Sequence, residues 1–200
     1  MRIGIFGGTF DPPHLGHLIL ADEAYIQLRL HKLLWVLTPD PPHKLGQQIS
    51  PVQQRLELVQ AAIGDNSHFE LSRVEMDRPG PHFAVDTVKL LQNQFPEAEL
   101  YYLIGGDSLH DLVRWNRPRE MVEAVVGLGV MRRPEDEIDL AALEKMLPGI
   151  TPKINLIDSP LIDIASHEIR ERISAGKAYR YHLHPAVYEL IRQRHYYQAL

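Results

Sequence analysis

The chain has 200 residues, a formal net charge of −5, 44% apolar residues and no cysteine. This length predicts a single domain over residues 1–200, large enough to bury a full core without disulfides. The negative charge argues against a protein that coats nucleic acid, but it leaves room for a local basic pocket for a small anion. No apolar run approaches the roughly 20 residues that span a bilayer, and no basic segment leads into an apolar signal region. We therefore expect a cytoplasmic protein with no membrane partner.

The first half of the chain alternates between short apolar runs and helical periodicity. Short apolar runs that end in glycine or polar residues predict buried strands, and apolar residues at helical spacing predict amphipathic helices. Ser50 followed by Gln53 is typical of a capping box, so we expect the serine to cap the second helix. The predicted elements are strand 2–6, helix 15–30, strand 33–37, a long proline-rich loop 38–50, helix 51–63 and strand 69–75.

The second half continues the alternation. We expect Ser166 to cap a helix that Gly176 ends. The tail 194–197 (RHYY) suggests packing or an interface, and nothing sharper. Because strands and helices alternate throughout, the predicted fold class is α/β, a Rossmann-like doubly wound parallel sheet with a small C-terminal helical portion. The predicted elements are strands 100–104, 127–131 and 154–157, and helices 83–95, 108–113, 118–125, 139–147, 166–175 and 185–194.

The chain is organised around residues 1–17, a strand that runs through a tight loop into a helix. Gly7, Gly8 and Thr9 would let backbone amides face an anion with no Cβ atoms in the way. His14 and His17 follow at the helix start, where free N–H groups and the helix dipole favour phosphate. The residues alone therefore predict a site for the phosphates of a nucleotide.

Two later loops also follow predicted strands. Lys44 lies in the loop 38–50, and Asp107 follows Gly105 after the strand 100–104. Ligands of doubly wound sheets bind at the carboxyl ends of the strands near the switch point, so these loops are expected to converge with the opening loop. The opening glycines match neither a P-loop nor the dinucleotide-binding fingerprint.

Residues 7–17, GGTFDPPHLGH, resemble the signature of the T/HxGH nucleotidylyltransferases, a family of adenylyl and cytidylyl transferases. Later segments resemble the bacterial nicotinate-nucleotide adenylyltransferases of that family, in the same order along the chain. This resemblance implies adenylyl transfer from ATP to nicotinate mononucleotide in NAD biosynthesis, giving deamido-NAD and pyrophosphate, with Mg²⁺ as cofactor. The segments are PPHK at 41–44, GGD at 105–107, RW at 114–115, RP at 133–134 and IASHEIR at 164–170.

The resemblance also implies a role for individual residues. The implied catalytic residues, which would stabilise charge on the phosphates, are His14, His17, Lys44 and Arg170. The implied ATP-binding residues are Gly7, Gly8, Thr9, Phe10, His17, Gly105, Asp107, Arg133, Ser166 and Arg170. The implied acceptor-binding residues are Thr9, Lys44, Ala84 near the carboxylate, Asp107 at the ribose and Trp115 stacked on the pyridine ring.

The chain departs from the family pattern at three places. Ala165 stands where the family has a serine, so one hydroxyl contact to the triphosphate is missing. Ala84 stands in a region where a threonine contacts the nicotinate carboxylate: a backbone amide contact would survive this change, and a hydroxyl contact would not. The segment 135–152 is longer than usual. The alternatives are the same chemistry on nicotinamide mononucleotide or another phosphate acceptor, and a non-catalytic nucleotide sensor.

Several of these residues also have simpler interpretations. His14 and His17 could form half of a metal site, with His43 as a loose third ligand. Asp107 could only cap the helix that follows it, Trp115 could be part of the core, and Lys44 could be a solvated charge. The sequence leaves open whether the chain forms a homo-oligomer.

Overall fold

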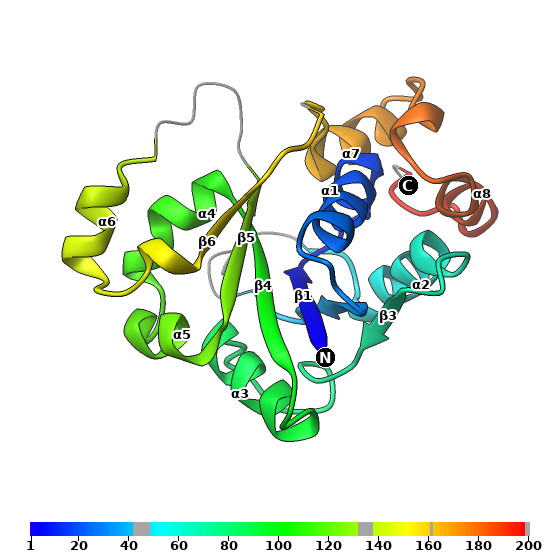
Figure 1. The fold of residues 1–200 in the computed structure, drawn as a ribbon. Helices are drawn as coiled ribbons and strands as arrows, with labels where there is room; N and C mark the ends of the chain where they lie inside the picture. Colours follow the sequence, from blue (N-terminus) through cyan, green and yellow to red (C-terminus); the bar gives the residue numbers. More distant parts are fainter. Residues whose placement is uncertain (42–48, 132–137, 161, 199–200) are drawn as a thin grey trace.

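The computed structural model describes residues 1–41, 49–131, 138–160 and 162–198. Within these residues, six parallel strands form one sheet in the order β3-β2-β1-β4-β5-β6 (Figure 1). This order and the parallel pairing confirm the predicted doubly wound sheet. The strands are β1 (Arg2–Gly8), β2 (Lys32–Leu37), β3 (Phe69–Ser72), β4 (Glu99–Gly105), β5 (Gly127–Met131) and β6 (Ile154–Ile157).

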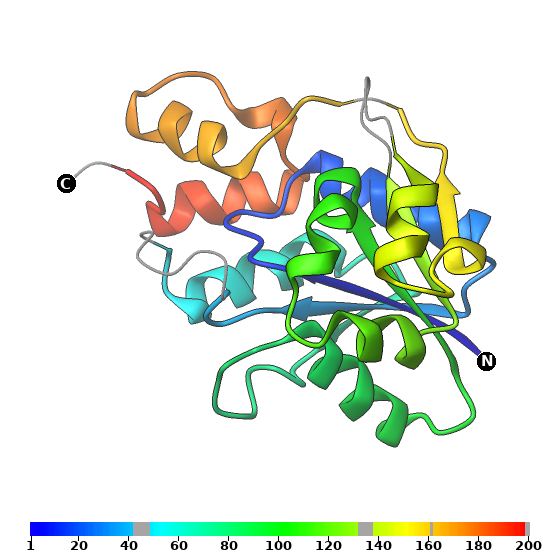
Figure 2. The same cartoon turned by 90° about the vertical axis from the view of Figure 1, so that its left-hand side faces the viewer.

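Helices cover both faces of the sheet (Figures 1 and 2). The helices α1, α2, α7 and α8 bury side chains in one apolar core, and α3, α4, α5 and α6 bury side chains in a second core on the other face. The α-helices are α1 (Leu15–Gln27), α2 (Val52–Ile63), α3 (Ala84–Gln94), α4 (Gly106–Asp111), α5 (Pro118–Ala124), α6 (Leu140–Met146), α7 (Ser166–Ser174) and α8 (Pro185–Arg194). The 3₁₀ helices are η2 (Leu112–Arg114), η3 (Thr151–Lys153) and η4 (Arg180–His182).

The alternation of side chains along β2 explains why both cores form. Leu33, Trp35 and Leu37 lie in the first core, and Leu34 and Val36 lie in the second. Successive side chains of a strand point to opposite faces, so an unbroken apolar run must be covered on both sides. The run LLWVL therefore determines that helices lie above and below this strand.

The strand order reverses between β1 and β4. These strands are paired up to Phe6 and Leu103. The helix that follows β1 packs in the first core through Leu20 and Ala21, whereas α4, which follows β4, packs in the second core through Leu109. The chain thus leaves the two neighbouring strands toward opposite faces. The carboxyl ends of two strands at such a switch point are the usual ligand site of doubly wound sheets.

Two predicted helix caps are wrong. Pro51, which has no side-chain donor or acceptor, rather than Ser50 is the N-cap of α2. The backbone of Ser50 makes tertiary contacts instead: its N–H donates to Asp11 Oδ2, and its carbonyl accepts from Arg55. Ala165 rather than Ser166 is the N-cap of α7. The Ser166 hydroxyl donates instead to a distant carbonyl. Both serines serve tertiary contacts that helix-start patterns do not encode.

Four predicted elements also differ in their bounds by two residues or more. The first strand extends to Gly8 rather than residue 6, and the first helix ends at Gln27 rather than at residue 30. The third strand ends at Ser72 rather than at residue 75, because the chain turns away there and buries Glu75 in the segment before α3. The predicted helix 108–113 begins earlier, at Gly106, and tightens into η2 after Asp111.

Candidate active site

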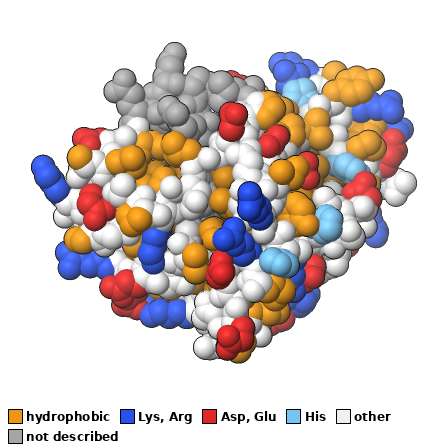
Figure 3. Space-filling view, in the orientation of Figure 1, with side chains coloured by type: hydrophobic (Ala, Val, Ile, Leu, Met, Phe, Trp, Pro, Cys, Tyr) orange, Lys and Arg blue, Asp and Glu red, His pale blue; other side chains and the backbone are white. Residues whose placement is uncertain are grey.

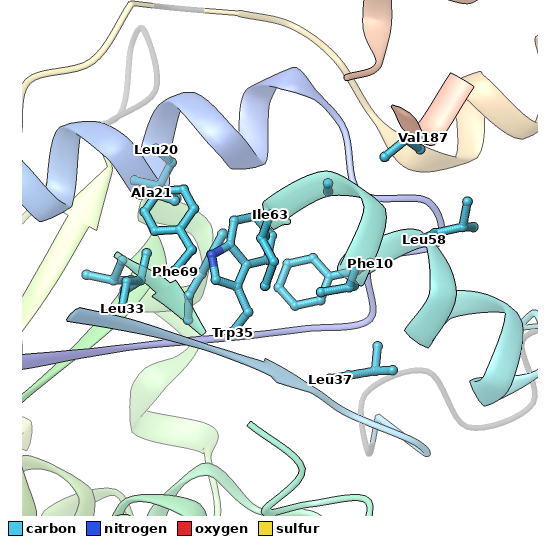
Figure 4. Close-up of a cluster of buried hydrophobic side chains, with 14 of the residues drawn as sticks. Phe10, Leu20, Ala21, Leu33, Trp35, Leu37, Leu58, Ile63, Phe69 and Val187 are labelled. Carbon is cyan, nitrogen blue, oxygen red and sulfur yellow. The ribbon is translucent and has the colours of Figure 1, made fainter. Parts of the chain in front are cut away.

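The loop between β1 and α1 is anchored by a buried phenylalanine. Phe10 is 2% exposed, and its ring centroid lies 5.3 Å from that of Phe6 and 5.0 Å from that of Trp35. Figure 4 shows Phe10 in the same apolar cluster as Trp35. The backbone of Phe10 has φ +48°, an unfavourable conformation that persists where the surrounding packing imposes it. Because this ring lies in the core, an ATP contact by Phe10 would have to come from its backbone.

The two glycines that end β1 make room for protein side chains. A Cβ at Gly7 would lie 2.7 Å from the Tyr102 hydroxyl, and a Cβ at Gly8 would lie 2.7 Å from the ring of Phe10. The space beside these two glycines, which the sequence predicts for an anion, is therefore occupied by the side chains of Tyr102 and Phe10. Gly105 differs, because a Cβ there would meet no heavy atom within 4 Å. Contacts from the backbone amides of the two opening glycines stay a prediction.

His17 has a fixed tautomer in its neutral form. The backbone N–H of His14, the N-cap of α1, donates to His17 Nδ1 over 3.2 Å, and the two ring centroids lie 3.7 Å apart. Since Nδ1 is the acceptor, the neutral ring carries its proton on Nε2, which is then a donor. The His17 ring also meets Phe10 edge-on at 5.2 Å. These two contacts hold the orientation of the donor.

His14 is uncharged at neutral pH. It is 7% exposed, and its Nδ1 has no hydrogen-bond partner among the described residues. Burial, with a smaller effect from His182, lowers its pKa to about 4. Within the described part of the chain, no third metal-binding side chain completes a site with this histidine pair. The loose third candidate, His43, lies outside the described residues.

Acid is expected to destabilise the protein through His14. Its pKa falls from 6.5 to about 4 on folding, so between these values the unfolded chain binds a proton that the native chain does not. Stability therefore rises with pH across this window, and lowering the pH from 7 to 5 should cost on the order of 1–2 kcal/mol. Urea unfolding at both pH values measures this loss, which should be smaller in His14→Gln. Equal losses in the two proteins would contradict the assignment.

Two side chains of α7 contact the opening loop. Ser166 Oγ donates to the carbonyl of Pro12 over 2.9 Å, and Arg170 Nη1 donates to the carbonyl of Asp11 over 2.7 Å. The side chain of Arg170 remains 32% exposed. The fold therefore brings both residues to the loop that leads into His14.

A buried arginine of α2 holds the same loop from the other side. Arg55 is 1% exposed and donates four hydrogen bonds of 2.8 to 2.9 Å. The acceptors are the carbonyl oxygens of Ser50, Thr9, Thr38 and Pro39. One side chain thus ties together the loop after β1, the loop after β2 and the start of α2.

Three further predicted site residues lie at the ends of α3, α4 and η2. Ala84 is the first residue of α3, where the leading N–H groups of a helix have no helical acceptor. Asp107 is exposed in the first turn of α4, and Gly105 rather than Asp107 is the N-cap. Trp115 follows η2, is half-buried and meets the ring of Tyr102 edge-on at 6.2 Å. Trp115 therefore belongs in part to the core, as its simpler interpretation held.

Sequence comparisons assign this arrangement to a family. A family model described as cytidylyltransferase-like matches residues 5–175. A probable nicotinate-nucleotide adenylyltransferase from Thermomicrobium roseum is 41% identical over 100% of this chain and 92% of its own length. A protein of the same name from Bacillus pumilus is 36% identical, covering 99% of both chains.

The chain belongs to the cytidylyltransferase-like family. The resemblance to the T/HxGH nucleotidylyltransferases, and to their nicotinate-nucleotide members, is thereby confirmed.

Solved structures support the same fold. The Plasmodium falciparum nicotinic acid mononucleotide adenylyltransferase complexed with NaAD has a TM-score of 0.80 at 20% identity, covering 98% of this chain and 97% of that chain. The same enzyme complexed with APC has a TM-score of 0.79, covering 98% and 96%. At this identity the likeness shows the fold alone.

Two of the predicted phosphate-binding residues lie in segments that the structure does not describe. Lys44, in the PPHK segment, and Arg133, in the Arg-Pro segment, lie outside the described residues. Their predicted contacts to phosphate therefore stay predictions.

Sequence reasoning missed Glu75 as well as Arg55. Glu75 is 3% exposed, and its Oε1 accepts a 2.5 Å hydrogen bond from the Thr87 hydroxyl of α3. Burial raises the pKa of Glu75, against hydrogen bonds from Thr87 and Thr38 and the charge of Arg78. This contact fixes the segment before α3, and so the position of Ala84. In the sequence, Glu75 after a strand and Arg55 inside a helix look like ordinary charged residues on the surface. A single sequence therefore gives no signal that either side chain is buried.

The surface carries charges of both signs. Figure 3 shows Lys and Arg side chains interspersed with Asp and Glu across one face of the molecule. Among the described residues, no helix has the length and apolar character needed to cross a membrane.

Proposed function

We propose that the chain transfers the adenylyl group of ATP to nicotinate mononucleotide. An oxygen of the acceptor phosphate forms a bond to the α-phosphorus of ATP, and the bond from that phosphorus to the β-phosphate oxygen breaks. The products are deamido-NAD and pyrophosphate. The nucleophile is already an anion, so the reaction needs positioning and neutralisation of charge rather than a general base.

The observation that carries this proposal is the meeting of four residues at one loop. His14 and His17 begin α1 at the carboxyl end of β1, and Ser166 and Arg170 of α7 bind the carbonyls of Pro12 and Asp11. Residues from two distant parts of the chain thus meet near the carboxyl end of β1, the end of the strands at which doubly wound sheets bind nucleotides. The relatives named as probable nicotinate-nucleotide adenylyltransferases, which match this chain over at least 92% of their own length, support the choice of reaction.

In this mechanism the histidines stabilise charge on the reacting phosphates. His17 donates through Nε2–H to an oxygen of the α-phosphate, in the orientation held by its Nδ1 contact. His14 is neutral and packs against it, so the two rings do not repel each other as charges. Arg170 and the free N–H groups at the start of α7, beginning with that of Ser166, hold the β- and γ-phosphates, while the Ser166 hydroxyl keeps its hydrogen bond to the Pro12 carbonyl. Lys44 and Arg133 neutralise further phosphate charge.

Mg²⁺ is the proposed cofactor. In the described residues, no group of three or more His, Cys, Asp or Glu side chains could hold a metal ion. Mg²⁺ would bind together with the phosphates of ATP, its usual manner with nucleotides, so Arg170 and the start of α7 would hold it indirectly by holding those phosphates. The ion would supply positive charge that offsets the negative charge on the departing pyrophosphate.

The acceptor lies on the side of α3 and η2 in this proposal. The leading N–H groups of α3, at Ala84 and Val85, suit a carboxylate, because a helix N-terminus attracts negative charge. They are backbone groups, so the absence of a threonine at position 84 leaves this interaction intact. Trp115 stacks on the pyridine ring, and Asp107 and Gly105 meet the ribose.

The decisive experiment measures pyrophosphate release from ATP with nicotinate mononucleotide, with nicotinamide mononucleotide and with neither. We expect release with the acid, slower release with the amide and only background without an acceptor. Faster release with the amide would contradict the assigned acceptor. No release with either would leave the nucleotide sensor or a different phosphate acceptor as the function.

A further inference from the structure

The chain ends in an unusual turn after α8. His195 has φ +55° and Tyr197 has φ +64°, so two side-chain-bearing residues within three adopt the left-handed conformation. Such residues are uncommon and cost on the order of 1 kcal/mol or more each, so they persist only where other contacts impose them. The tail 194–197 was notable in the sequence without a function, and its contacts account for the turn.

This turn directs the side chains of Tyr196 and Tyr197 to different parts of the molecule. The Tyr196 hydroxyl donates to Glu57 Oε2 of α2 over 2.9 Å. The Tyr197 hydroxyl donates to Asp11 Oδ1 over 2.8 Å. Asp11 belongs to the GGTFDPPHLGH signature, so the second tyrosine connects the end of the chain to the beginning of the active site.

Asp11 is a buried junction. It is 4% exposed, and its Oδ2 accepts the backbone N–H of Ser50 over 3.1 Å and lies 3.8 Å from Arg170 Nη1. A carboxylate buried to this extent must have donors for its oxygens. Tyr197 supplies the donor for Oδ1, and burial followed by the nearby charge of Asp11 raises its pKa, so this phenol stays protonated.

The junction controls the geometry of the loop that leads to the histidines. Phe10, on one side of Asp11, is fixed in the core, and Pro12, on the other side, is held through its carbonyl by Ser166. The carboxylate between them fixes the middle of the loop. If the Asp11 carboxylate lost one donor, the loop between Phe10 and Pro12 would be free to move. This movement would reach His14, because it follows only two residues after Pro12.

We propose that Tyr197 is a positioning residue for adenylyl transfer: by holding Asp11, it keeps the opening loop in the conformation that aims His14 and His17. The inference rests on the proposed function for its kinetic consequence. Its structural consequence, a tighter opening loop, does not depend on the reaction.

The test compares Tyr197→Phe with Tyr196→Phe, which deletes the same hydroxyl one residue away. In Tyr197→Phe we expect kcat to fall about tenfold with both KM values within about twofold, since misplacing reacting groups affects the transition state more than ground-state binding. Tyr196→Phe should keep kcat within about twofold. Thermal unfolding of both variants confirms that the assays use folded protein.

Hydrogen exchange provides a readout apart from activity. Amides of residues 9–17 should exchange faster in Tyr197→Phe and be unchanged in Tyr196→Phe. Equal kcat losses in both variants, or unchanged exchange at 9–17 in Tyr197→Phe, would overturn the inference. A wild-type protein that is inactive with both pyridine nucleotides would refute the proposed function instead, and the exchange comparison would still decide whether Tyr197 holds the loop.

Discussion

Replacing His17 by alanine is expected to lower kcat by on the order of 10²–10³-fold, the usual effect of one lost donor to the transition state. The physical reason is the fixed tautomer: the backbone of His14 occupies Nδ1, so Nε2–H is the donor in the neutral ring. ATP binding should change far less, because charge on the phosphates grows only as the reaction proceeds. Pyrophosphate release measures kcat, and calorimetric titration with ATP measures affinity.

Two further variants make this prediction specific. His17→Gln retains an N–H donor on a chain of similar reach and should lose less activity than the alanine variant. His68→Ala removes an exposed histidine that stacks on Tyr25 and lies just before β3, remote from the carboxyl ends of the strands. It should keep kcat within about twofold. Near-normal turnover in His17→Ala would remove this histidine from the mechanism.

Replacing Arg55 by methionine is expected to lower the free energy of unfolding by on the order of 3–5 kcal/mol. Methionine fills much of the space but donates nothing, so four carbonyl oxygens of three segments lose a charged donor together. These segments include Thr9 at the opening loop, so activity should fall as well. Urea unfolding measures the stability loss.

The matched control for this variant is Arg73→Met. The side chain of Arg73 is 54% exposed and pairs with Asp77 on the surface, where an ion pair contributes little. Its loss should cost no more than about 0.5 kcal/mol. Arg55→Lys keeps the charge but not the planar set of donors, so it should lie between the two. A stability loss in Arg55→Met as small as in the control would show that the loops hold without this arginine.

The architecture could be predicted because it follows from local patterns. The strands β5 and β6 and the helix α8 have the predicted bounds. The run LLWVL of β2 could only be a strand covered on both faces, and the alternation of elements required a parallel sheet. Where prediction failed, as at Ser50, Ser166 and Glu75, a polar group was used by a distant partner instead of by its neighbours along the chain.

The candidate site could likewise be predicted from the sequence only in part. The opening signature identified the loop, and the Ser166 and Arg170 segment identified its partner, because both are short motifs that remain readable in a single sequence. The assigned roles of these residues stay predictions. Their anchors could not be read, because Arg55, Asp11 and Tyr197 act through contacts between residues that are far apart in the sequence.

The sequence by itself determined the family, the sheet and the histidine pair at the first helix, because each depends on residues that are close together along the chain. The structure also shows the tautomer of His17, which a contact within the first turn of α1 sets. Only the tertiary structure decided that Gly7 makes room for Tyr102 and that Tyr197 holds Asp11. These features depend on packing and hydrogen bonds between segments up to 186 residues apart. Such contacts arise when the sheet forms, and a local pattern of residues does not encode them.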